Sequence, residues 1–211
     1  MRNDLGTFDT RNLAPLCRRA VEYGLQPALL VAALLLWHPL RERPELYLFV
    51  LLAAQVVLGV LEHFVPARAD QVQGPREKLA NVALVTLFTA FAGVVTVLYR
   101  GGLAEPLGEL RASLGLDLWP SGWPLAARVL LAFLASELVW YSIHRSEHRF
   151  AWLWRVSGHG VHHSFKRLNA INFNANHPLE AFLILIPMTL LTLVFGVGEE
   201  AGAASLLVVV N

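Results

Sequence analysis

Residues 125–148, LAARVLLAFLASELVWYSIHRSEH, begin as an apolar run and end in two histidines. At a rise of about 1.5 Å per residue, the run 125–143 is long enough to cross most of the hydrocarbon layer of a membrane as a helix. Glu137, Tyr141, His144 and His148 fall at positions i, i+4, i+7 and i+11, which is one face of such a helix. The stretch therefore predicts a membrane-spanning helix whose polar stripe ends in two imidazoles one turn apart.

Other apolar runs lie on both sides of this helix. They cover residues 25–40, 46–65, 79–99 and 179–197, and a further run starts at 206–211. Of the 211 residues, 55% are hydrophobic and 16% are charged, whereas soluble domains carry about a quarter charged residues. A soluble helical protein with so many apolar runs would have too little polar surface.

The sequence therefore predicts an all-α, polytopic transmembrane helical bundle, with residues 1–211 as a single membrane domain of about five spans. The run at 206–211 is too short to cross a membrane, so we expect the chain to be incomplete.

The positions of Lys and Arg predict the orientation of the spans. Twelve of the 17 lie in the N-terminal segment and in the loops after the second and fourth runs, and five lie on the alternate side. By the positive-inside rule, the first three segments and the histidines among them face the cytoplasm. The net charge of +1 gives no indication of a nucleic-acid partner. Cys17 is the only cysteine, which excludes a disulfide and a cysteine-based zinc site within one chain.

A second histidine cluster, HGVHH, follows at residues 159–163. If this segment is helical, His159, His162 and His163 share a face, because they stand at i, i+3 and i+4. Together with His144 and His148 they place five of the eight histidines of the chain between residues 144 and 164. An i, i+4 pair can present two nitrogens to one metal ion, and neutral imidazoles favour iron, zinc or copper over calcium or magnesium.

Further residues are candidates for supporting roles. Glu137 lies about two turns deeper than the histidines and can accept a hydrogen bond from a ligand imidazole or from Tyr141. His177, directly before the run 179–197, lies on the same side of the membrane and is a candidate for lining the site. His63, at the end of the run 46–65, is also on this side.

Three stretches together resemble the fatty acid hydroxylase/sterol desaturase superfamily of integral membrane di-iron enzymes. They are ELVWYSIHRSEH (137–148), LWRVSGHGVHHS (153–164) and RLNAINFNANHPLE (167–180). The family pattern runs from an acidic residue through His-Arg-x2-His, Leu-Trp and His-x2-His-His-Ser to an Asn-rich stretch and His-Pro-x-Glu. The matching residues are Glu137, Tyr141, His144, Arg145, His148, Leu153, Trp154, His159, His162, His163, Ser164, Asn169, His177, Pro178 and Glu180.

The resemblance implies an oxidoreductase that uses O2 to hydroxylate or desaturate a fatty acyl, sterol or ether lipid. It implies two iron ions, with the ligands His144, His148, His159, His162, His163 and His177, and with Glu137 and Tyr141 supporting them. The implied partners are a lipid from the bilayer, O2 and a cytochrome b5-like or ferredoxin-like electron donor. The implied location is a bacterial inner membrane or the endoplasmic reticulum membrane, with the histidines facing the cytoplasm. The family also has a last His-x2-His-His box that this chain lacks, so we do not expect activity from residues 1–211 alone.

Two other functions fit part of the pattern. HRSEH, residues 144–148, matches the H-x-x-E-H of inverzincin zinc metallopeptidases, with Glu147 as the general base. This reading leaves the histidines at 159–163 unexplained. A membrane metal-binding or transport protein without enzymatic activity is the second alternative, although transport favours polar residues midway through several spans.

Overall fold

The computed structural model describes residues 15–42, 45–64, 66, 72–116 and 118–210, and these residues contain helices and no strand. The first four helices are long: α1 (Pro15–Glu42), α2 (Glu45–Phe64), α3 (Pro75–Ser113) and α4 (Leu125–Arg149). The remaining elements are α5 (Ala151–Ser157), η3 (His159–Ser164), η4 (Pro178–Glu180), α6 (Ala181–Ile184), α7 (Ile186–Leu190), η5 (Leu191–Phe195) and α8 (Glu200–Val210). Part of the positive charge that predicts the orientation, at residues 1–14 and 67–71, lies outside the described residues.

Among the described residues, four helical segments are long and apolar enough to cross a membrane. They are Arg19–Trp37, Pro75–Ser113, Leu125–Arg149 and Pro178–Phe195, and Leu52–Phe64 in α2 is a shorter apolar segment. Along α4, Leu130, Leu134 and Leu138 are exposed at every fourth position, while Val129, Ala132 and Ser136 are buried. An exposed leucine stripe of this kind suits contact with lipid. The expected class, a helical transmembrane protein, is confirmed.

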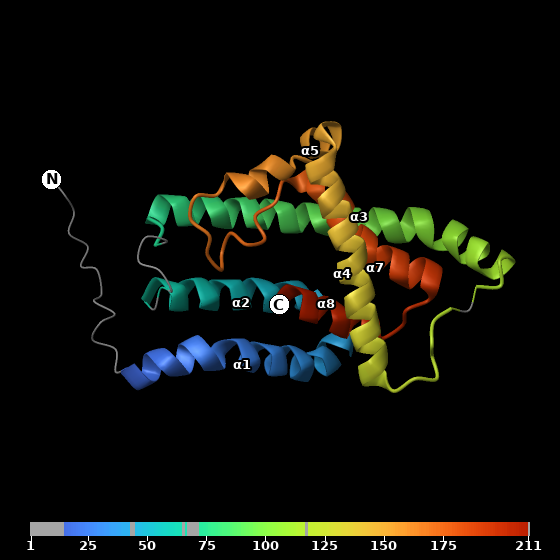
Figure 1. Ribbon diagram of the computed structural model, residues 1–211, viewed down its shortest axis with the longest axis horizontal. Coiled ribbons are helices and arrows are strands. Elements are labelled where there is room, and N and C mark those ends of the chain that lie inside the picture. The colour runs from blue at the N-terminus through green and yellow to red at the C-terminus, as the bar shows by residue number, and fades with distance from the viewer. Residues whose placement is uncertain (1–14, 43–44, 65, 67–71, 117, 211) are drawn as a thin grey trace.

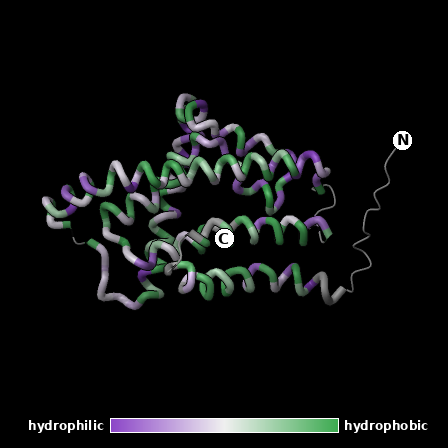
Figure 2. The backbone as a smooth tube through the Cα atoms, turned by 180° about the vertical axis from the view of Figure 1, so that it is seen from behind, coloured by the Kyte–Doolittle hydropathy of each residue, from purple (hydrophilic) through white to green (hydrophobic). Residues whose placement is uncertain are grey.

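The helices pack around α4 and α8. Figure 1 shows α1, α2 and α3 running along the long axis of the molecule, while α4 crosses their direction. The last helix, α8, packs against both α4 and α1. In Figure 2 the hydrophobic colour dominates the middle of the long helices, and hydrophilic residues gather around α5, beyond the end of α4. The polar, histidine-rich segment therefore lies at one end of α4.

The helix α3 is longer than the apolar run at 79–99 suggests. Gly101, Gly102 and Pro106 predict a loop from Arg100 onward, but α3 continues to Ser113. The prediction was wrong because tertiary contacts hold the last turns. The Arg111 guanidinium donates from Nε to the Leu116 carbonyl at 3.2 Å and lies against Gly196. One proline inside a helix costs a backbone hydrogen bond, which such contacts offset.

The last span is not a regular helix. Residues 178–195 consist of the 3-10 turn η4, two short helices, α6 and α7, and the π-helical turn η5. Pro187 at the start of α7 accounts for the break between the two α-helices, because proline cannot donate to the preceding turn. The Tyr99 hydroxyl donates to the Phe182 carbonyl at 2.6 Å and ties this irregular span to α3. The irregular backbone places Glu180 at the end of the span that faces α5.

A buried ion pair joins α4 to α8 at the other end of α4. The Arg128 Nη1 atom lies 2.9 Å from Glu200 Oε2, and Glu200 is fully buried. The Trp119 indole N–H donates to the other oxygen of the same carboxylate. Both oxygens of Glu200 therefore have a partner. We call Trp119, Arg128 and Glu200 the far cluster.

Candidate metal centre

Two non-helical residues, Phe150 and Gly158, fold the histidine-rich segment back onto α4. Phe150 has an extended conformation (φ −113°, ψ 107°) that ends α4 and starts α5. Gly158 then ends α5 in the left-handed region with φ of 73°, which favours glycine, and η3 follows directly. His144 and His148 on α4 are thereby brought next to His159 and His163 on η3.

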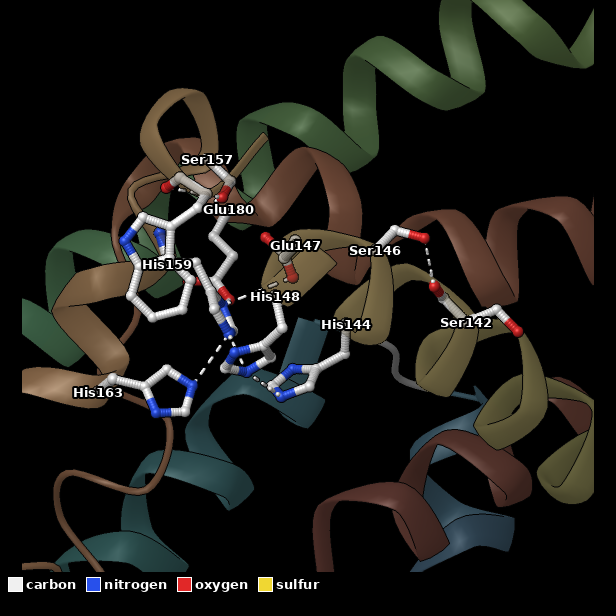
Figure 3. A network of polar contacts seen from close by, with 10 residues as sticks. Ser142, His144, Ser146, Glu147, His148, Ser157, His159, His163 and Glu180 are labelled. Atoms are coloured by element: carbon white, nitrogen blue, oxygen red, sulfur yellow. Dashed lines mark hydrogen bonds and ion pairs between the residues drawn. The ribbon is translucent and has the colours of Figure 1, made fainter. Parts of the chain in front are cut away.

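Four imidazoles converge on one point. The Nε2 atom of His148 lies 3.2 Å from that of His144 and 3.4 Å from that of His159, and the Nε2 atom of His163 lies 3.1 Å from that of His159. Figure 3 shows the four side chains pointing toward one another. We call His144, His148, His159 and His163 the histidine cluster; their ligand atoms lie within 4.8 Å of one another.

The spacing of these nitrogens fits a metal ion. Metal–imidazole bonds of about 2.0–2.1 Å put neighbouring nitrogens about 2.9–3.4 Å apart around one ion, whether tetrahedral or octahedral. The three separations of 3.1–3.4 Å lie in this range. All four donors are imidazole nitrogens, which suit iron, zinc and copper. The residues present therefore fit the kind of metal that the sequence predicts.

The histidines of η3 have lowered pKa values, which favour the binding of a metal cation. Burial, and then the neighbouring histidines, lower the pKa of His159 to about 3. Burial and nearby histidines also lower the pKa of His162 and of His163. Because a metal binds the neutral form of imidazole, lowered pKa values keep these nitrogens available near neutral pH.

Trp154 forms one wall of the histidine cluster. Its ring stacks on His163, with centroids 5.3 Å apart and planes inclined by 25°, and it lies 5.0 Å from the ring of His159. Gly160 permits this approach, since a Cβ atom there would lie 3.1 Å from the Trp154 Nε1 atom. The indole therefore shields one side of the cluster from water.

His162 and His177 lie near the cluster but outside the convergent set. The His162 ring centroid is 5.9 Å from that of His159, and its buried Nδ1 atom has no hydrogen-bond partner among the described residues. The Nδ1 atom of His177 accepts from the backbone N–H of Leu179 at 3.2 Å and caps η4. His177 packs on Gly158, where a Cβ atom would lie 2.7 Å from its Nδ1. Their roles as ligands stay predictions.

Other candidates lie in different surroundings. Tyr141 is exposed, and its hydroxyl accepts from Arg145 Nη1 at 3.0 Å. Glu137 is half-buried on α4, about two turns before His144. His63 lines a small pocket with Glu62, outside the histidine cluster. The supporting roles expected for Glu137 and Tyr141 also stay predictions.

Two carboxylates that were not among the expected metal ligands and their supporting residues contact the cluster. The His159 Nδ1 atom lies 2.7 Å from Glu180 Oε1 and 3.5 Å from Glu147 Oε2. Both glutamates are fully buried. The sequence contained a signal for each, since Glu147 stands at i+3 from His144 and Glu180 ends the His-Pro-x-Glu motif. A general base must face its substrate, so the burial of Glu147 disfavours the metallopeptidase reading.

The asparagine-rich loop between η3 and η4 is anchored on α2 and α3. The Ala170 N–H donates to Glu62 Oε2 at 2.7 Å. Gln73 Nε2 donates to the Arg167 carbonyl at 2.8 Å, and the buried Asn81 donates to Gln73 at 2.7 Å. These contacts fix the path of the chain that leads from η3 to Glu180.

Comparison with known proteins finds a family match in the C-terminal part. The family model described as fatty acid hydroxylase matches residues 129–211. Ornithine lipid hydroxylase OlsE of Rhizobium tropici is 29% identical over 184 residues, which are 82% of this chain and 54% of that protein. The chain thus spans about half the length of this curated relative. No solved structure matches. The resemblance to the superfamily is confirmed for residues 129–211, which match the fatty acid hydroxylase family model.

Proposed function

We propose that this chain, whose residues 129–211 match the fatty acid hydroxylase family model, supplies the histidine-rich metal centre of an iron-dependent membrane lipid hydroxylase that uses O2. The observation that carries the proposal is the convergence of four imidazoles at the end of the apolar helix α4. Their ligand atoms lie within 4.8 Å of one another, and three of the Nε2 separations are 3.1–3.4 Å. Bound iron supplies the activation of O2 and the oxidation of an unreactive C–H bond.

The residues of this chain have separate tasks in that function. His144, His148, His159 and His163 hold one ion, and we propose His162 and His177 as ligands toward a second iron. Trp154 lies against His163 and His159 and excludes water from one side of the centre. The position of the centre at the end of a lipid-contacting helix lets a substrate stay in the bilayer while its reacting carbon reaches the metal.

The relative favours hydroxylation over desaturation. It is named as a hydroxylase of ornithine lipid, and we propose a lipid with a fatty acyl chain as the substrate class, ahead of sterol and ether lipids. The alternative of a non-enzymatic metal-binding or transport protein has less support, because the histidines gather at one end of α4 and not midway through several spans.

We propose that the cluster faces the cytoplasm, in a bacterial inner membrane or the endoplasmic reticulum membrane. Arg145, Arg149 and Arg155 are exposed beside the cluster, on α4 and α5. Such a basic surface attracts an acidic partner. A cytochrome b5-like or ferredoxin-like electron donor fits this requirement.

The metal content of the detergent-purified chain tests the proposal. Wild type, His148→Ala and His162→Ala would be expressed with added iron and analysed for iron and zinc, with His63→Ala as the matched control. We expect iron in wild type and in the control, a loss of the ion in His148→Ala and a smaller loss in His162→Ala. Unchanged metal in both cluster variants contradicts the proposal.

The reaction is tested separately with lipids. Chain and electron donor would be incubated with isotope-labelled O2 and a panel of ornithine, fatty acyl, sterol and ether lipids. Incorporation of one labelled oxygen indicates hydroxylation, whereas a new double bond without label indicates desaturation. Because the chain spans about half of its relative, the assay would include the full relative as a positive control.

A further inference from the structure

His159 lies at the centre of the site and makes contacts through both ring nitrogens. Its Nε2 atom faces His148 and His163 at 3.4 and 3.1 Å, and its Nδ1 atom faces Glu180 at 2.7 Å. Its side chain has no exposure to solvent. Each nitrogen therefore has one kind of partner, histidines on one side and carboxylates on the other.

The contact with Glu180 suits one tautomer of His159. An imidazole whose Nε2 lone pair binds a metal carries its hydrogen on Nδ1, and the Glu180 oxygen 2.7 Å away is placed to accept it. The lone pair then lies on Nε2, which points at the other histidines. A carboxylate in this position also raises the basicity of a ligand imidazole.

The surroundings of the two carboxylates differ from those of a structural ion pair. Close hydrogen-bond partners are lacking among the described residues at both oxygens of Glu147 and at one oxygen of Glu180, where the Ser157 hydroxyl and the His177 backbone make only weaker contacts. Burying a carboxylate without partners costs several kcal/mol by rough estimate. Glu200, equally buried, has a partner for each oxygen. Stability therefore gives less reason to keep Glu147 and Glu180 beside His159 than to keep Glu200 in the far cluster.

We infer that Glu180 and Glu147 are positioning residues that hold the proton on His159 Nδ1 and direct its Nε2 atom at the metal. Glu180 is the direct acceptor, and Glu147, 3.5 Å from the same nitrogen, provides a second negative group from α4. Glu180 belongs to η4 and Glu147 to α4, so the pair fixes η3 between two spans. The inference rests on the proposed metal-binding function.

The test uses Co2+ as the probe, with the whole chain in detergent. Glu180→Gln keeps the shape of the side chain but removes its charge, Glu180→Asp keeps the charge, and Glu147→Gln tests the second carboxylate. Glu200→Gln controls for the loss of a buried charge in the far cluster, and Glu105→Gln for the loss of an exposed one. The measurements are the Kd for Co2+, the visible absorption of bound Co2+, thermal unfolding of the metal-free chain, and nitrogen NMR of labelled histidine, which reports the tautomer.

We expect Glu180→Gln to weaken Co2+ binding about 10- to 100-fold and to alter its absorption spectrum. Glu147→Gln should weaken binding less, and Glu180→Asp should restore part of the affinity. The unfolding temperature of the metal-free chain should not fall in Glu180→Gln. Glu200→Gln should show the opposite pattern, with a lower unfolding temperature and an unchanged Kd and spectrum.

The inference is overturned if Glu180→Gln leaves the Kd and spectrum of wild type unchanged. It is also overturned if wild type binds two Co2+ ions and either glutamine variant loses one of them, because the carboxylates would then be ligands of a second ion. Failure of the proposed function has a different signature. If wild type binds no metal but NMR shows His159 protonated on Nδ1 in a way that depends on Glu180, the metal function fails and the positioning role stands.

Discussion

Buried carboxylates occur near both ends of α4, and the two sets have different surroundings. In the far cluster, Arg128 and Trp119 together contact both oxygens of Glu200. In the histidine cluster, Glu147 and Glu180 contact His159 and retain three oxygens without a close hydrogen-bond partner among the described residues. Satisfied polar groups stabilise a fold, whereas unsatisfied buried groups persist where a function needs them. The comparison separates a structural site from a functional one without reference to the family.

The largest expected effect is on the far cluster. Arg128→Met leaves the fully buried Glu200 without its cation and should lower the free energy of unfolding by about 3–5 kcal/mol. Denaturant unfolding in detergent measures this change. The Kd for Co2+ should stay at the wild-type value, as measured at a temperature where the variant is folded. A variant that remains stable but loses Co2+ would show that the two clusters are coupled and would break the comparison.

Measuring stability at different pH values tests the histidine cluster, the other site in this comparison. The pKa of His159 is about 3 in the folded protein, and the usual value for an unfolded chain is about 6.5. Between these values the unfolded chain binds a proton that the native state does not, so stability is present above this window and is lost as the pH falls through it. His159 should therefore destabilise the metal-free chain more at pH 5 than at pH 7, roughly the middle and the upper side of that window, and comparison with a variant that lacks the imidazole isolates this contribution.

The control for the pH series is His159→Phe, which removes the titrating group and keeps a ring of similar size. Its unfolding temperature should depend less on pH than that of wild type. Equal pH dependence in the two proteins would assign the effect to other groups.

The smallest expected effect concerns an exposed ion pair. Arg167 Nη1 lies 2.9 Å from Glu77 Oε2, and both side chains are more than one-third exposed. Glu77→Gln should change the free energy of unfolding by about 0–1 kcal/mol and leave Co2+ binding unchanged. A larger loss, measured by the same denaturant titration, would show that the anchor of the asparagine-rich loop carries more stability than an exposed pair supplies.

The sequence was sufficient for the class of fold and for the first pair of histidines. Apolar runs report membrane spans directly, and the i, i+4 spacing of His144 and His148 places them on one face of α4 without tertiary information. The same local information was misleading for α3, where Gly101, Gly102 and Pro106 suggested a loop. The contacts of Arg111 that support the helical turns there come from residues that follow it in sequence, up to Gly196.

The partners of His159 could not be predicted from local sequence patterns. Glu180 stands 21 residues after His159 and reaches it through the asparagine-rich loop, whose path depends on contacts with Glu62 and Gln73. The 3-10 geometry of η3 also changed which histidines converge. A helical face groups His159, His162 and His163 equally, whereas the structure joins His159 and His163 to α4 and leaves the His162 Nδ1 atom without a partner among the described residues.

The buried clusters at the two ends of α4 also limit how the protein adapts to its bilayer. Arg128 and Glu147 are 19 residues apart, or about 28 Å along the helix, which is close to the thickness of a hydrocarbon layer. A span usually tilts or slides to relieve hydrophobic mismatch. Here a movement of α4 relative to its neighbours would pull a buried carboxylate away from its partners at one end, so we expect α4 to tilt only together with the elements on which it packs. The helix thereby keeps the histidine cluster at a constant distance from the far cluster.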